Sequence, residues 1–190
     1  WAGVDHFCDE SLYQNPDCRL TNSSGAYGTT ISEHLIMVCL MLLRRQMEYT
    51  EIIRAGGWET LPGGIRSLHG ARITVLGTGD IGTEFARRAQ AFHPACITGV
   101  RRTVRSSDPA FTSIHAIAEL DSVLPETDLL VMALPSTAET VGILSRERIA
   151  LLPDSAFVVN VGRGTAIDQE ALCDALNAGR LAGAAHAAVP

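Results

Sequence analysis

The sequence predicts an α/β fold of the Rossmann type, a doubly wound parallel sheet covered by helices. After Gly70, apolar stretches of strand character alternate with stretches of helical periodicity, the order that places parallel strands side by side. The strand-like stretches, such as 129–133, are almost continuously apolar, as expected for strands buried on both faces. We expect strands near 72–77, 96–100, 128–133, 156–161 and 181–186, and helices near 80–92, 117–124, 145–151 and 168–178.

A glycine-rich turn joins the first predicted strand to the helix that follows it. It reads Gly77-Thr78-Gly79-Asp80-Ile81-Gly82, a G-x-G-x-x-G pattern. Between a strand and a helix, Gly77 makes the tight turn, Gly79 lets a diphosphate approach the backbone, and Gly82 allows close helix packing. The N–H groups of the helix start would bind the diphosphate. The turn therefore predicts a dinucleotide-binding segment, although ordinary glycine turns can show the same pattern.

The chain before this alternation has a different character. Residues 9–24 are polar and rich in turn formers, and we interpret residues 1–24 as a remnant of a second domain cut from a longer protein. Residues 25–190 then form the dinucleotide-binding domain, including a helix over 30–46. The middle of this helix is apolar nearly all round, so the sheet or another subunit must cover it.

The composition excludes several classes of protein. The formal net charge of −6 argues against a nucleic-acid surface. All 15 basic residues are arginines, which excludes Schiff-base and Walker-type lysine chemistry. The five cysteines are scattered without ligand spacing, which predicts a reduced cytoplasmic protein with no metal site. Nothing at the N-terminus resembles a signal peptide, and the apolar run at 35–43 is too short to span a membrane.

The end of the second predicted strand bears on the choice of cofactor. An acidic residue at about this place would bind the ribose 2′-hydroxyl of NAD, but the sequence has Arg101 and Arg102 instead. A guanidinium is a good bidentate partner for a 2′-phosphate. We therefore predict that NADP is preferred and that NAD is possible; the alternative is a solvated basic patch.

Two later strand ends complete the predicted site. Leu134, Pro135 and Thr140 follow the strand predicted at 128–133. Their loop could either line the binding site of the cofactor or form a plain turn. The next strand ends in Asn160-Val161-Gly162-Arg163-Gly164. An arginine between two glycines is hard to explain by packing. We predict that Arg163 binds a substrate carboxylate and polarises the neighbouring carbonyl, the alternative being a surface arginine.

The histidines give no clear acid/base candidate. His34, His69, His93 and His115 lie outside the predicted strand-end loops, and we interpret them as structural. His6 and His186 lie nearer the predicted cleft, but the strand register of His186 disfavours an acid/base role. No Ser–His–Asp or paired-carboxylate arrangement stands out.

Taken together, these residues make the chain resemble the D-isomer-specific 2-hydroxyacid dehydrogenase family. The segments that carry the resemblance are 2–5, 30–45, 57–58, 68–70, 77–82, 134–140, 160–164 and 181–185. The resemblance implies an oxidoreductase that transfers hydride between NAD(P)H and a small 2-keto or 2-hydroxy acid. It also implies a nucleotide domain inserted into a substrate domain, and a homodimer. Arg163 matches the family's catalytic arginine, and Gly3, Val4 and Asp5 match a loop that binds the substrate carboxylate.

The C-terminal residues depart from the family pattern. Ala187 occupies the place of an aspartate that helps to hold the nicotinamide amide, and the family's glutamate and acid/base histidine have no counterpart. We expect both to lie outside this chain, and the 190-residue piece alone to be inactive. The alternatives are a dinucleotide-binding scaffold or redox-sensing corepressor-like module without turnover, and a relative of alanine dehydrogenase, against which 160–164 argues.

Overall fold

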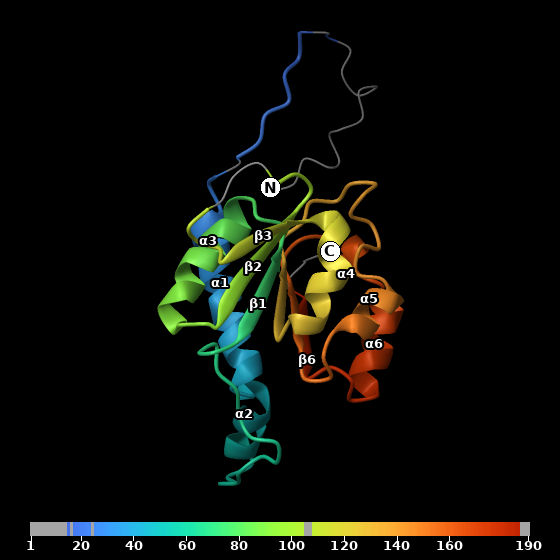
Figure 1. The fold of residues 1–190 in the computed structure, drawn as a ribbon. Helices are drawn as coiled ribbons and strands as arrows, with labels where there is room; N and C mark the ends of the chain where they lie inside the picture. Colours follow the sequence, from blue (N-terminus) through green and yellow to red (C-terminus); the bar gives the residue numbers. More distant parts are fainter. Residues whose placement is uncertain (1–14, 16, 24, 105–107, 187–190) are drawn as a thin grey trace.

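Six parallel strands form one sheet in the order β3-β2-β1-β4-β5-β6. The computed structural model describes residues 15, 17–23, 25–104 and 108–186. The strands are β1 (Arg72–Leu76), β2 (Cys96–Arg101), β3 (Ser113–Ala116), β4 (Leu129–Met132), β5 (Phe157–Asn160) and β6 (Gly183–His186). This order reverses direction beside β1, as in Rossmann folds, and Figure 1 shows the resulting twisted sheet. The predicted fold class is confirmed.

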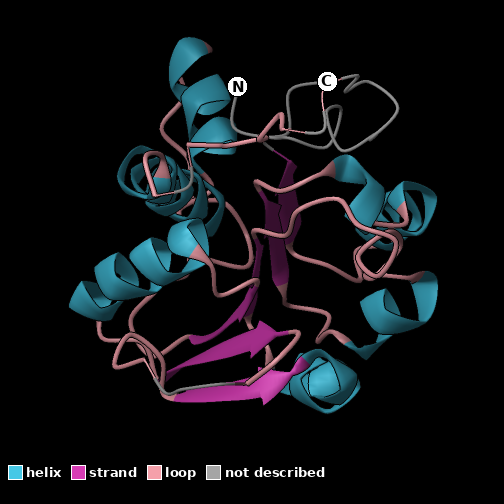
Figure 2. Ribbon diagram, turned by 90° about the horizontal axis from the view of Figure 1, so that it is seen from above, coloured by secondary structure: helices cyan, strands magenta, loops and turns pink. Residues whose placement is uncertain are grey.

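Helices cover both faces of the sheet (Figure 2). The α-helices are α1 (Gly28–Leu43), α2 (Gln46–Arg54), α3 (Asp80–Ala89), α4 (Leu120–Val123), α5 (Arg146–Leu151) and α6 (Gln169–Asn177). The 3₁₀ turns are η3 (Gln90–Phe92), η4 (Ile117–Glu119), η5 (Leu124–Glu126) and η6 (Gly164–Ala166). None of the helices in the described ranges is long and apolar enough to cross a membrane.

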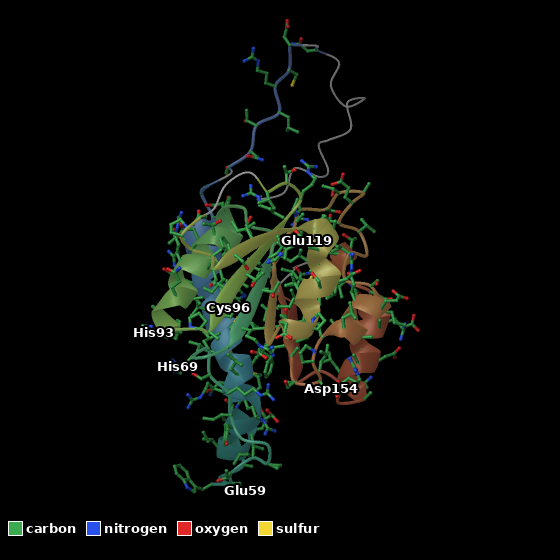
Figure 3. The ribbon with its side chains drawn as sticks, in the orientation of Figure 1. Glu59, His69, His93, Cys96, Glu119 and Asp154 are labelled. Atoms are coloured by element: carbon green, nitrogen blue, oxygen red, sulfur yellow. The ribbon has the colours of Figure 1, made fainter. Side chains whose placement is uncertain are left out.

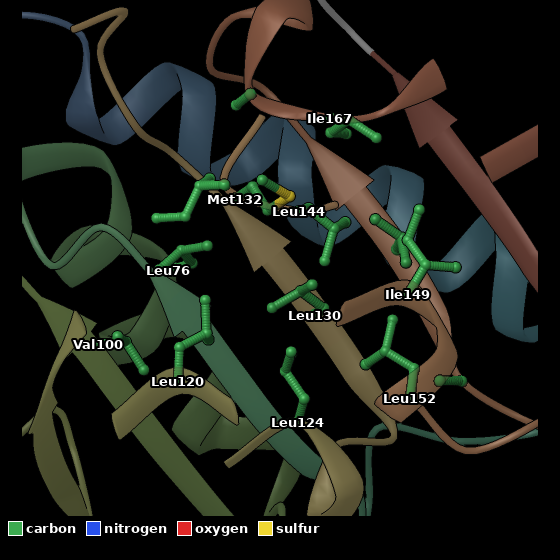
Figure 4. Close-up of a cluster of buried hydrophobic side chains, with 14 of the residues drawn as sticks. Leu76, Val100, Leu120, Leu124, Leu130, Met132, Leu144, Ile149, Leu152 and Ile167 are labelled. Atoms are coloured by element: carbon green, nitrogen blue, oxygen red, sulfur yellow. The ribbon is translucent and has the colours of Figure 1, made fainter. Parts of the chain in front are cut away.

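The strand side chains divide between two cores because successive residues of a strand point to opposite faces. Ile73 and Val75 pack with α1 and α3, whereas Leu76 packs with α4 and α5 on the other face. Leu130 and Met132 of β4 join this second core, which Figure 4 shows in close-up. Burial on both faces explains why these strands are almost continuously apolar in sequence.

The edge strand β3 was not among the predicted strands. Its four residues are only half-buried and include His115, because β3 pairs with β2 alone. An edge strand of this kind needs no continuous apolar run, so its sequence carries little signal.

The helix predicted over 30–46 corresponds to α1, but α1 already ends at Leu43 and a separate helix, α2, begins at Gln46. Arg45 adopts a left-handed conformation with φ of 53°, and its guanidinium bonds to Glu48 and to the carbonyl oxygen of Pro62. Only residues 15 and 17–23 of the predicted remnant 1–24 are described, and they form no helix or strand. The two-domain division stays a prediction.

Candidate cofactor site

The turn after β1 has the geometry that a G-x-G-x-x-G segment requires. Gly77 has a φ of +103°, and a Cβ there would lie 2.7 Å from the carbonyl oxygen of Ala133. A Cβ at Gly82 would lie 2.0 Å from the carbonyl oxygen of Gly77. Only glycine fits at these two positions. Gly79 differs, because no atom lies within 4 Å of its would-be Cβ, so its backbone is open to approach.

The start of α3 is open as well. The helix has ten residues, and its N-cap residue Gly79 provides no side-chain hydrogen bond. The N–H groups of the first turn therefore lack a side-chain cap, and the positive end of the helix dipole adds to their attraction for an anion. Asp80 is the exposed first residue of α3. Its carboxylate lies against α1, because both of its oxygens are 2.6 Å from the would-be Cβ of Gly28.

Thr78 carries a buried hydroxyl without a partner. The residue is 9% exposed, and its Oγ1 is the buried side-chain polar atom that finds no hydrogen bond among the residues described. Leaving a buried hydroxyl unpaired costs free energy. A ligand in the 77–82 turn would explain why the group is retained there, so this turn fits a dinucleotide.

The two arginines after β2 have different surroundings. Arg101 is the last residue of β2 and is half-buried. Arg102 is exposed, and its Nη1 lies 3.5 Å from Oε2 of Glu139, which belongs to the loop after β4. This ion pair links the loop after β2 to the loop after β4.

The loop after β4 is closed by Thr140. The Thr140 hydroxyl donates to the carbonyl oxygen of Pro135 at 2.7 Å and accepts from the N–H of Thr137 at 2.8 Å. Thr140 is only 7% exposed. Its side chain therefore stabilises the loop through these two hydrogen bonds. Leu134 is buried and belongs to the core, whereas Pro135 is exposed.

The segment after β5 is held by the side chain of Asn160, which is 1% exposed. Its Oδ1 accepts from the N–H of Gly162 at 2.9 Å, and its Nδ2 donates to the carbonyl oxygen of Arg163 at 3.1 Å. A Cβ at Gly162 would lie 2.5 Å from the carbonyl oxygen of Leu134, so this segment packs on the loop after β4. Val161 and Arg163 are half-buried.

The structure thus brings most of the predicted site residues to one edge of the sheet, where the strands end. They are the residues of 77–82, 101–102, 134–140 and 161–163. Gly3, Val4 and Asp5 lie outside the described residues, as does His6. His69 and His93 precede β1 and β2, so they lie at the opposite edge (Figure 3), with their ring centroids 6.4 Å apart.

Sequence reasoning missed three features of this edge. It did not assign Asn160 a role, although a buried asparagine between an apolar strand and a glycine loop is a usable signal. It found neither the Glu139 partner of Arg102 nor the contact between His186 and Asn160. Within 25–104 and 108–186, no group of three His, Cys, Asp or Glu side chains is placed to hold a metal ion.

Comparison with known proteins identifies the family. The family model for the D-isomer specific 2-hydroxyacid dehydrogenase, NAD binding domain, matches residues 36–187. The chain belongs to this family. It is 34% identical to glyoxylate/hydroxypyruvate reductase B of Pectobacterium carotovorum, over 96% of this chain and 58% of the relative. The chain therefore spans less than two thirds of the length of such curated relatives.

Solved structures of the D-2-hydroxyacid dehydrogenase family have the same fold. A family member from Aeromonas salmonicida is 30% identical, with a TM-score of 0.83 over 100% of this chain and 60% of the other. A family member from Xanthobacter autotrophicus, solved in complex with NADPH and MES, is 28% identical, with a TM-score of 0.80 over 100% of this chain and 77% of the other.

Proposed function

We propose that this member of the family is an oxidoreductase that transfers hydride between NADP(H) and a small 2-keto or 2-hydroxy acid. The observation that carries the proposal is that the 77–82 turn, with its unpartnered Thr78 hydroxyl, and the Arg163 segment follow strands that end at the same edge of the sheet, each packed on the loop after β4. Two relatives support the chemistry: one is named as a glyoxylate/hydroxypyruvate reductase, and another was solved with NADPH.

Each part of the edge has a task in this proposal. Residues 77–82 and the start of α3 hold the diphosphate, and Arg101 and Arg102 hold a 2′-phosphate. The loops with Leu134, Pro135 and Thr140 and with Val161 and Gly162 line the rest of the cofactor. When bound, the nicotinamide supplies or accepts the hydride.

The substrate is assigned to Arg163. Its guanidinium binds the carboxylate and polarises the adjacent carbonyl. Gly3, Val4 and Asp5 add backbone N–H groups to the carboxylate, as the family resemblance implies. We assign the acid/base histidine and its glutamate to a part of the protein outside these 190 residues.

The cofactor assignment is tested by fluorescence titration with NADPH and NADH. We expect the wild-type chain to bind NADPH more tightly, by about tenfold or more, because two guanidinium groups meet the 2′-phosphate. Arg101→Ala combined with Arg102→Ala removes the difference. Equal affinity of the wild type for NADPH and NADH would show that the NADP assignment is wrong.

Turnover separates an enzyme from a binding module. Glyoxylate, hydroxypyruvate and pyruvate are added to the chain with NADPH, and its oxidation is followed by absorbance. We expect binding without turnover for the 190 residues, and turnover when they are expressed with the flanking sequence of their gene. Ready turnover by the 190 residues would contradict the assignment of the acid/base group.

We also infer a homodimer in the cytoplasm. Helix α2 buries none of its residues, and Met47, Ile53 and Trp58 are 62%, 65% and 98% exposed. A second copy of the chain would cover these side chains. The four cysteines within the described ranges are free thiols, which suits a reducing compartment.

A further inference from the structure

The side-chain amide of Asn160 has one hydrogen left after it has bound the Arg163 segment. Gly162 can only donate and the Arg163 carbonyl can only accept, so the two contacts determine which amide atom is oxygen and which is nitrogen. Nδ2 carries two hydrogens, and the Arg163 carbonyl takes one. Because Asn160 is 1% exposed, the second hydrogen needs an acceptor from the protein.

His186 provides that acceptor. Residues 160 and 186 are direct partners in the pairing of β5 with β6, and Nδ1 of His186 lies 3.5 Å from Nδ2 of Asn160. The distance is that of a long hydrogen bond. Since Nδ2 can only donate, this contact requires Nδ1 to accept, which is the tautomer that carries its proton on Nε2.

The ring of His186 also lies against the segment that Asn160 holds. Its Nε2 is 3.4 Å and its Cε1 3.5 Å from the would-be Cβ of Gly164. The imidazole therefore borders both Asn160 and the residue after Arg163, from a strand that ends beside them.

We propose that His186 is a positioning residue for Arg163. Its Nδ1 completes the hydrogen bonding of Asn160, and Asn160 in turn holds the backbone of Gly162 and Arg163. The proposal concerns the local structure; its effect on the cofactor rests on the function proposed above, because the Arg163 segment lies at the nicotinamide end only in that assignment.

Two substitutions separate the acceptor from the bulk of the ring. His186→Leu replaces the ring by an apolar side chain of similar size and removes the acceptor. His186→Asn is the conservative variant, because its Oδ1 stands close to the place of Nδ1 and accepts the same hydrogen. The first readout needs no cofactor: it is the amide hydrogen exchange of Gly162, measured by NMR.

We expect exchange at Gly162 to be about threefold to tenfold faster in His186→Leu, the range that one modest hydrogen bond accounts for. His186→Asn stays within about twofold of the wild type. Equal exchange in His186→Leu and the wild type, or equal acceleration in both variants, would overturn the proposal, because packing rather than the acceptor would then explain the residue.

The second readout is the dissociation constant for NADPH compared with that for adenosine 2′,5′-bisphosphate, which lacks the nicotinamide half. His186→Leu weakens NADPH binding by about threefold to tenfold and leaves the bisphosphate unchanged, and His186→Asn restores NADPH binding. Equal weakening of both ligands would overturn the positioning role at Arg163. If the wild type binds neither ligand while Gly162 responds as expected, the proposed function fails and the positioning of the segment is supported.

Discussion

Arg102 and Glu139 form an ion pair of 3.5 Å that joins the loop after β2 to the loop after β4. Both side chains are largely exposed, at 76% and 64%, so the pair adds little to stability. In the function proposed above, the pair would act on cofactor binding, because the carboxylate engages a guanidinium that we assign to the 2′-phosphate.

Glu139→Gln should therefore strengthen NADPH binding. Removing the carboxylate frees Arg102 and takes away a negative charge near the phosphate, and we expect a dissociation constant about twofold to fivefold lower at low salt. NADH binding stays unchanged. Glu126→Gln is the matched control, because Glu126 pairs with Arg72 at the opposite edge of the sheet. An equal gain for NADH would contradict the assignment of Arg102.

Gly82→Ala and Gly79→Ala should fail in different ways. The new Cβ at position 82 would meet the Gly77 carbonyl oxygen at 2.0 Å, so we expect a loss of about 3 kcal/mol in the free energy of unfolding. At position 79, no atom lies within 4 Å of the place that the new Cβ would occupy. For Gly79→Ala we expect the free energy of unfolding to fall by less than about 1 kcal/mol. NADPH binding should be more than about tenfold weaker, because the methyl group lies where the diphosphate would approach the backbone.

Urea denaturation and NADPH titration separate these two outcomes. Wild-type affinity in Gly79→Ala would show that the diphosphate does not approach this glycine.

Asp128 should contribute stability that depends on pH. It accepts from the backbone N–H of Arg72 at 2.8 Å and from the Arg72 guanidinium at 3.2 and 2.9 Å. The hydrogen bonds from the Arg72 side chain lower the pKa of the Asp128 carboxyl below its ordinary value. A lowered folded-state pKa gives stability that is present above the unfolded pKa of about 3.9 and is lost as the pH falls through the folded value.

Asp128→Asn should therefore cost about 1 kcal/mol at pH 7, and the cost should stay constant down to about pH 5 and shrink below about pH 4. Urea denaturation across that range measures it. Asp154→Asn is the control, since Asp154 pairs with Arg180 while 73% exposed. A cost that grows as the pH falls would have the wrong sign for this ion pair.

The exposed residues around α2 should control assembly. If the inferred dimer forms, Ile53→Asp combined with Trp58→Ser should convert it to a monomer at micromolar concentration, because the two most exposed apolar side chains of this region become polar. Light scattering after size exclusion measures the mass. Val141→Ser, at a residue 57% exposed elsewhere, should leave the dimer intact. A wild type that is already monomeric would contradict the inference.

The strand–helix alternation and the 77–82 turn could be predicted because their causes are local. Continuous apolar runs indicate strands that are buried on both faces. Gly77 is required by its positive φ, and Gly82 is required by its close contact with Gly77, only five residues away. The order of the parallel strands follows from the fold class. These features need no knowledge of distant partners.

The remaining features depended on contacts between segments far apart in the chain. Edge strand β3 exists because β2 offers it a partner, and the break at Arg45 involves Pro62, 17 residues further on. Asn160 contacts His186, which lies 26 residues further along the chain. Arg102 pairs with Glu139, which lies in the loop after a different strand. The fold class and the 77–82 turn could be predicted without the structure, because local backbone geometry and burial dictate both. The pairing of polar groups at the sheet edge could not be predicted, because such pairs form only after the folded sheet has brought distant strands together.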